Sequence, residues 1–289
     1  MTIRDLGYRP YEGVRLPASH NTWVMLRHAL SRAWGSWMVK LAAFLGWVPP
    51  AIAIAGVGIQ WWLTQQATQA GVPLEEIPPI DGGDSIHSLY LWQLWLFGLM
   101  ITLGAGASAI SEDLAFKAFP FYFAKPVTPP QYLLGRVLAV AIWLFCLLFI
   151  PGFLMVMLLV GTAPADARLE SLGLVLPAFL DAVLIAGVCA AASVGVSALS
   201  GSRALTMSAW ILIFVVPWVL GTIVDEVGDW PWLKLASLPA LLGVVGDTLF
   251  KVAREDDLSW YHALPVLAAM TFGGLSLSIR RLRGAEVVT

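Results

Sequence analysis

Six long runs without Asp, Glu, Lys or Arg limit what this chain can fold into. They lie at 41–63, 85–111, 137–165, 182–202, 204–224 and 258–279. Each is long enough for the roughly 20 residues that a helix needs to cross a bilayer. Only 12% of the residues are charged, about half the share of an ordinary soluble domain, which excludes a water-soluble globular enzyme. The sequence predicts a polytopic membrane protein.

The basic residues predict how these spans are oriented. Thirteen of the 17 lysines and arginines fall in segments that would share one face of the membrane: the first 40 residues, the loop between spans 2 and 3, the link after span 4, and the C-terminus. Thirteen acidic residues would face the other side. Because loops rich in Lys and Arg stay in the cytoplasm, both termini are expected to be cytoplasmic. The net charge of −2 gives no indication of nucleic-acid binding.

We therefore predict an all-α single transmembrane domain, residues 1–289, with spans at about 41–63, 89–111, 134–160, 173–199, 204–224 and 259–279. Residues 1–40 would form a cytoplasmic tail and an amphipathic elbow helix. This helix should lie at the interface with its tryptophans inward and with His28 and Arg32 toward anionic lipid. The outer segment 225–257 contains an uncharged run, Leu235–Gly246, which is too short to span and is expected to form a re-entrant or cap helix.

Two features inside the predicted spans need partners from neighbouring helices. Pro49 and Pro50 interrupt the first span, and such a break must be satisfied by other helices. Asp181 is the only ionisable residue well inside a predicted span, about 10 Å below its outer edge. Intramembrane acids usually face a protein interior or an aqueous cavity, so Asp181 is a candidate for a substrate or ion path. The alternative is a carboxyl group that reaches the interface or caps a neighbouring helix.

The loop between spans 2 and 3 contains signals for two helices. Ser111 is placed to cap a short helix whose first turn holds Glu112 and Asp113, and Pro120 would end it. Residues 128–131 (Thr-Pro-Pro-Gln) mark the next helix start. A rigid loop of this kind suits either a segment that transmits force to a partner or an ordinary well-capped connector.

Motifs for nucleotide or metal chemistry are absent from the sequence, including the phosphate-binding loop and His-Glu-x-x-His. Ser197 and His262 resemble the pair of an intramembrane protease, but the predicted spans place them at opposite ends, whereas a nucleophile and its base must lie within about 3 Å. Cys146 and Cys189 fall inside predicted spans and form no disulfide framework. We expect no catalytic, metal or cofactor site on this chain.

The order of these features resembles the permease subunit of type-2 ATP-binding-cassette exporters. Locally, 125–128 (Lys-Pro-Val-Thr) and 132–136 (Tyr-Leu-Leu-Gly-Arg) are similar to the pattern that leads into span 3 of that family. Glu112 and Asp113 resemble the acidic start of its cytoplasmic coupling helix. The sequence departs from the family at 116–123, where an aromatic-rich stretch replaces the usual Gly-Thr.

This resemblance implies a permease in the bacterial inner membrane that exports a substrate with ATP hydrolysed on another chain. Two copies of an ATP-binding-cassette ATPase, carrying ATP and Mg, would each receive a coupling helix, and a second permease copy would complete a homodimer in the lipid bilayer. The ATPase contacts would come from Glu112, Asp113, Phe116, Lys117, Phe119, Phe121 and Lys125. The residues alone also allow a secondary transporter or channel that uses Asp181, or a membrane scaffold without transport activity.

Overall fold

The chain folds into a helical bundle, seen here in a computed structural model that describes residues 17, 19–71, 81–123, 127–227, 231–253 and 258–286. Within these ranges, six helical segments are long and apolar enough to cross a membrane, which confirms the predicted number of spans. They are Trp37–Gln69, Gly82–Ala115, Pro129–Thr162, Arg168–Ser197, Arg203–Ile223 and Trp260–Gly284.

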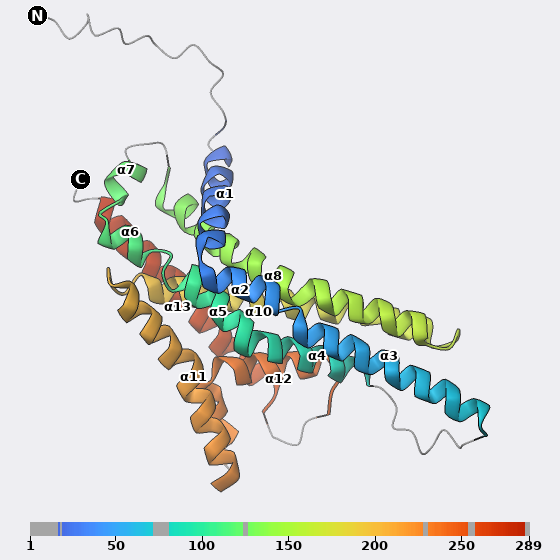
Figure 1. Ribbon diagram of the computed structural model, residues 1–289. Helices are drawn as coiled ribbons and strands as arrows, with labels where there is room; N and C mark the ends of the chain where they lie inside the picture. The colour runs from blue at the N-terminus through green and yellow to red at the C-terminus, as the bar shows by residue number, and fades with distance from the viewer. Residues whose placement is uncertain are drawn as a thin grey trace, which may run out of the picture.

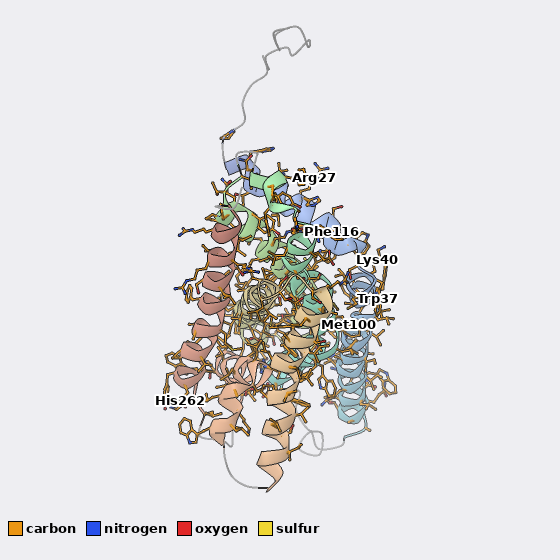
Figure 2. The ribbon with its side chains drawn as sticks, turned by 90° about the vertical axis from the view of Figure 1, so that its left-hand side faces the viewer. Arg27, Trp37, Lys40, Met100, Phe116 and His262 are labelled. Carbon is orange, nitrogen blue, oxygen red and sulfur yellow. The ribbon has the colours of Figure 1, made fainter. Side chains whose placement is uncertain are left out.

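The two ends of the bundle carry different elements. One end, which we call the terminal end, holds α1 (Ser19–Gly35), α6 (Ser111–Ala115), α7 (Phe119–Phe123) and the last turns of α13 (Trp260–Glu286) (Figure 1). The opposite end, the distal end, holds α12 (Leu238–Phe250). In Figure 2, Arg27 and Phe116 lie at the terminal end and His262 at the distal end.

The cations gather at the terminal end. Of the twelve Lys and Arg residues in the described ranges, nine belong to that end, and Arg168, Lys234 and Lys251 belong to the distal end. The predicted clustering of basic residues on one face is therefore present in the fold.

The first span is built from two helices, α2 (Trp37–Leu45) and α3 (Val48–Gln69). The break precedes the adjacent prolines, which occupy the first turn of α3, where a missing N–H removes no helical hydrogen bond. Gln93 supplies the partner for the break, because its Nε2 donates to the carbonyls of Gly46 (3.2 Å) and Leu147 (3.0 Å). The interrupted helix is thus satisfied by a buried amide from the second span.

The second span begins at Gly82, seven residues before the predicted start at 89. Its helix starts there because the Asp81 carboxylate accepts a hydrogen bond from the backbone N–H of Asp84 (3.1 Å). The span comprises α4 (Gly82–Gln93), η3 (Leu94–Gly98), α5 (Leu99–Ile101), η4 (Thr102–Gly106) and α6. Both η3 and η4 are π-helical, a geometry that occurs frequently at functional sites.

The central helix is α10, which follows the short α9. It packs mainly on α8 and α13 and also touches α12 and η4. The remaining elements are α8 (Pro129–Thr162), α9 (Arg168–Gly173), α10 (Val175–Ser197), α11 (Arg203–Val227) and η5 (Pro231–Ala236). Small residues let α10 approach α13 closely, because the backbones of Gly195 and Gly274 meet with no room for a side chain. In Figure 1, α11 diverges from α3 and α8 toward the distal end.

The short apolar helix α12 lies inside the bundle rather than across its mouth. Its side chains are buried on most faces, and it packs against α4, α10, α11 and α13. Ser237 caps its first turn by accepting the N–H of Ala240 (3.3 Å). A helix that is apolar on all sides is stable when other helices or lipid surround it. The burial of α12 therefore favours the re-entrant helix of the sequence analysis over a cap on the surface.

We predict that Gly195→Ala lowers the free energy of unfolding by about 1–3 kcal/mol, because the added methyl group overpacks the α10–α13 contact. Gly187, on the same helix, has no heavy atom within 4 Å of a built Cβ. Gly187→Ala should therefore be neutral or stabilise the helix by up to about 1 kcal/mol. Thermal unfolding of the two detergent-purified variants measures these effects. Equal unfolding midpoints for Gly195→Ala and Gly187→Ala would contradict the close contact between α10 and α13.

Candidate functional site at the terminal end

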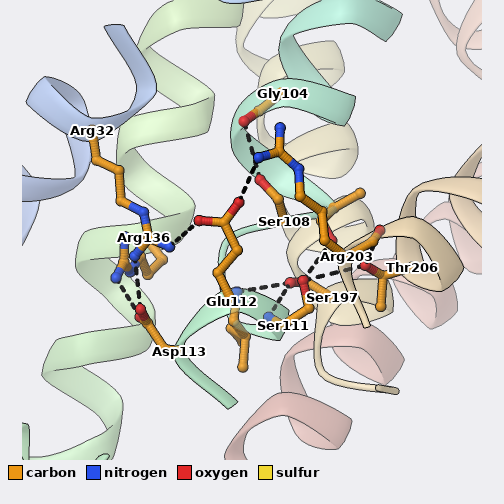
Figure 3. Close-up of polar contacts among 12 residues, drawn as sticks. Arg32, Gly104, Ser108, Ser111, Glu112, Asp113, Arg136, Ser197, Arg203 and Thr206 are labelled. Carbon is orange, nitrogen blue, oxygen red and sulfur yellow. Dashed lines mark hydrogen bonds and ion pairs between the residues drawn. The ribbon is translucent and has the colours of Figure 1, made fainter. Parts of the chain in front are cut away.

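Five charged side chains from four helices form one network at the terminal end (Figure 3). Arg32 of α1 pairs with both carboxylates of α6, and its Nη1 lies 2.7 Å from Oδ1 of Asp113. Arg203 of α11 places Nη1 2.8 Å from Oε1 of Glu112. Arg136 of α8 completes the network through its ion pair with Asp113. The network therefore joins α1, α6, α8 and α11.

Asp113 is held inside the protein, with 4% of its surface exposed. Its carboxylate accepts hydrogen bonds from Arg32, Arg136 and the Tyr132 hydroxyl. The expected role of this residue in contacting an ATPase does not fit this position. Arg136 is equally buried, at 3% exposed, and a guanidinium in apolar surroundings requires a counter-charge.

The Tyr132–Arg136 pattern has a physical role at this site. Tyr132 and Arg136 are one helical turn apart on α8 and both reach Asp113. Gly135, between them, lets α1 cross α8 closely, because a Cβ built there would lie 2.8 Å from Cβ of Met25. The signal for these contacts was present in the sequence as a Tyr–Arg pair at i, i+4 with a glycine beside it.

Arg32 keeps its positive charge at neutral pH. Partial burial alone would lower the pKa of Arg32, but its hydrogen bonds to Glu112 and Asp113 raise that pKa above its ordinary value. Burial, together with the charges of Arg136 and Arg32, lowers the pKa of His28, so its imidazole is neutral at pH 7. Arg32 therefore turns toward α6 and not toward lipid headgroups, contrary to the amphipathic-helix expectation.

The start of α6 is capped by the hydroxyl group of Ser197, which belongs to a different helix, α10. Its Oγ, at the end of α10, accepts the backbone N–H groups of Ile110 (2.7 Å) and Ser111 (2.9 Å). Ser111, the expected cap, is buried, and its hydroxyl accepts from Oγ1 of Thr206 (3.3 Å). The expectation failed because α6 follows η4 after a single turn, residues 107–110, so tertiary contacts satisfy its amides. His262 lies at the distal end (Figure 2), which excludes a Ser197–His262 pair.

The link after α6 and the helix α7 each expose an aromatic side chain. Lys117 adopts a left-handed conformation (φ 51°) that ends the α6 region. Phe116 and Phe121 are 79% and 77% exposed, and we call Phe116, Lys117 and Phe121 the aromatic surface. Phe119 faces inward, with its ring edge-on to Tyr132 at 5.6 Å. Pro120 does not end a helix as expected, since it occupies the first turn of α7, where proline is tolerated.

The predicted site residues thus divide into four groups. Glu112, Asp113 and Phe119 support the loop from within, while the aromatic surface is exposed. Lys125 lies outside the described residues. Asp181 is remote from them, fully buried in α10 with its Oδ2 3.1 Å from Nδ1 of His87. Its carboxyl group therefore does not reach the interface. The sequence analysis missed His87 because it lies in an uncharged run.

Among the described side chains, no three His, Cys, Asp or Glu residues are placed to hold a metal ion. Comparison with known proteins found no matching family model and no matching curated protein. The arrangement at the terminal end is therefore the basis for inferring function. It consists of an exposed aromatic surface on a loop fixed by charges to three other helices.

We predict that Asp113→Asn destabilises the protein by about 3–5 kcal/mol, because it leaves Arg136 buried without its counter-charge. The double variant Asp113→Asn with Arg136→Met should recover much of that loss, since the buried charge is then removed. Glu112→Gln, at a partly exposed position, serves as the control and should cost about 1 kcal/mol or less. Thermal unfolding in detergent measures each variant, and a double variant no more stable than Asp113→Asn would contradict the pairing.

Proposed function

We propose that this chain is the permease subunit of an ATP-binding-cassette exporter and that its α6–α7 segment docks a separate ATPase subunit. The observation that supports this most is the aromatic surface, because Phe116 and Phe121 expose large apolar rings at a helix end. Exposed aromatic residues surrounded by polar groups are typical of protein–protein contacts. The resemblance of residues 125–136 to the family pattern agrees with this assignment.

The network beneath the aromatic surface would convert docking into movement of the bundle. Asp113 connects α6 to α1 and α8, and Glu112 connects it to α1 and α11. Separating Asp113 from Arg136 in a low-dielectric interior is costly, whereas the partly exposed Glu112–Arg203 pair is a weaker link to α11. A displacement of α6 is therefore transmitted mainly to α1 and α8. This is the property that a coupling segment needs, and a plain connector has no need of it.

The proposal assigns ATP chemistry to the partner. Two copies of the ATPase, with ATP and Mg, would act on a homodimer of this chain in the bacterial inner membrane. The terminal end would face the cytoplasm, where the positive-inside rule places its cations and where ATP is available. This chain would then be non-catalytic and would provide the membrane path.

We predict that Phe116→Ala combined with Phe121→Ala abolishes assembly with the ATPase and lowers coupled ATPase activity at least about tenfold, as expected for central interface aromatics. Both side chains are exposed, so thermal stability should be unchanged. Phe272→Ala, at an exposed residue of α13, is the matched control. The measurement is co-purification of the tagged permease with the ATPase from its native membrane, followed by ATP hydrolysis.

Two other outcomes would favour the alternatives, one in a transport assay and one in the ATPase assay. Transport driven by a proton gradient without ATP would indicate a secondary transporter. A stable complex whose ATPase activity is insensitive to the Phe116 and Phe121 substitutions would indicate a scaffold. Either result would overturn the proposal.

We also predict the orientation of the bundle in the membrane. In a variant lacking Cys146 and Cys189, Gln69→Cys at the distal end should react with a membrane-impermeant maleimide in intact cells. Lys117→Cys at the terminal end should react only after permeabilisation, because basic ends remain in the cytoplasm. Labelling of Lys117→Cys in intact cells would contradict the proposed docking of a cytoplasmic ATPase.

A further inference from the structure

At the distal end, His87 lies between two carboxylates from two other helices. Its Nδ1 is 3.1 Å from Oδ2 of Asp181 on α10, and its Nε2 is 3.4 Å from Oδ1 of Asp247 on α12. His87 itself belongs to α4. Three helices thus each contribute one ionisable side chain to the same point.

The centre of this cluster is shielded from solvent. His87 is 2% exposed and Asp181 is fully buried. Gly246 packs directly against the imidazole, and a methyl group there would overlap the ring. The Phe250 ring covers it from 5.8 Å between centroids. In the described part of the chain, Oδ1 of Asp181 and Nε2 of His87 make no hydrogen bond, so the cluster has unused capacity to bind a proton.

The described charges that act on Asp181 are those of His87 and Asp247. Tyr90 is the other titratable side chain near Asp181, and its hydroxyl donates instead to the carbonyl of Ala178 (3.3 Å). Two carboxylates therefore share one imidazole in surroundings where an uncompensated charge is strongly unfavourable.

We propose that His87, Asp181 and Asp247 form a proton-binding site and that the bound proton holds α12 against α4 and α10. A protonated imidazole donates from both ring nitrogens, and each nitrogen here faces a carboxylate oxygen. A neutral imidazole donates from only one, so one carboxylate then faces a lone pair.

Loss of the proton weakens the contact with Asp247 first. This contact is the longer of the two, and Asp247 lies on the short helix α12 and not on a span. Histidine is the side-chain type that changes charge between about pH 5 and 8. Because lower pH favours binding of the proton, α12 is held at low pH and released as the pH rises. The inference is independent of the proposed ATP-driven function.

Hydrogen–deuterium exchange of the α12 peptide, corrected for intrinsic rates, tests the inference on the purified full-length protein. Between about pH 5.5 and 8, corrected exchange of α12 should become at least about tenfold faster, as for a local opening. His87→Gln should exchange rapidly and equally at both pH values. Unchanged protection of the wild-type helix across this range would overturn the proposal.

Matched variants distinguish this site from other titrating groups. Asp84→Asn, at an exposed carboxylate on α4, and His262→Gln, at a histidine of the distal end, should both keep the pH dependence. Asp247→Asn changes the partner on α12 and should remove the pH dependence of α12 exchange. This variant provides the test if His87→Gln does not fold. Retention of the pH dependence in Asp247→Asn would also overturn the proposal.

Discussion

A charge or an unpaired backbone group buried inside the bundle has no water to solvate it, so the protein itself must supply the partner. This constraint explains the main polar contacts of the fold. Gln93 satisfies the carbonyl freed by the break in the first span, Ser197 satisfies the amides at the start of α6, and Arg136 is buried only together with Asp113. Each partner comes from a different helix, so the polar contacts also fix how the helices pack.

The two ionic clusters at opposite ends differ in chemistry. At the terminal end three arginines meet two carboxylates, and arginine stays charged at any physiological pH. The positive charges of that cluster do not depend on pH, so its ion pairs are suited to transmitting a displacement. At the distal end the imidazole of His87 lies between two carboxylates, and an imidazole is charged only when it is protonated. That cluster is suited to a reversible contact. Helix α10 contributes to both ends, through Ser197 and Asp181, about 24 Å apart along its axis.

Several elements were predictable because their signals are local. The six apolar segments follow from hydropathy and length, and α8 begins at Pro129 as the sequence of 128–131 indicated, with the Thr128 N–H donating to Gln131 (3.0 Å). The loop after the second span contains exposed aromatic side chains at two of the positions expected to meet a partner, Phe116 and Phe121. Boundaries were less accurate where a cap lay beyond the apolar run, as at Asp81.

The sequence by itself determined that the chain has six segments long and apolar enough to cross a membrane, with its cations gathered at one end, because hydropathy and charge position are properties of the chain. Only the tertiary structure decided which buried groups meet. Asp113 faces inward to Arg136, and His87 lies between Asp181 and Asp247. These pairings depend on the rotation of each helix about its axis and on its depth relative to its neighbours. A long apolar run leaves both undetermined, since it has no polar face to orient it.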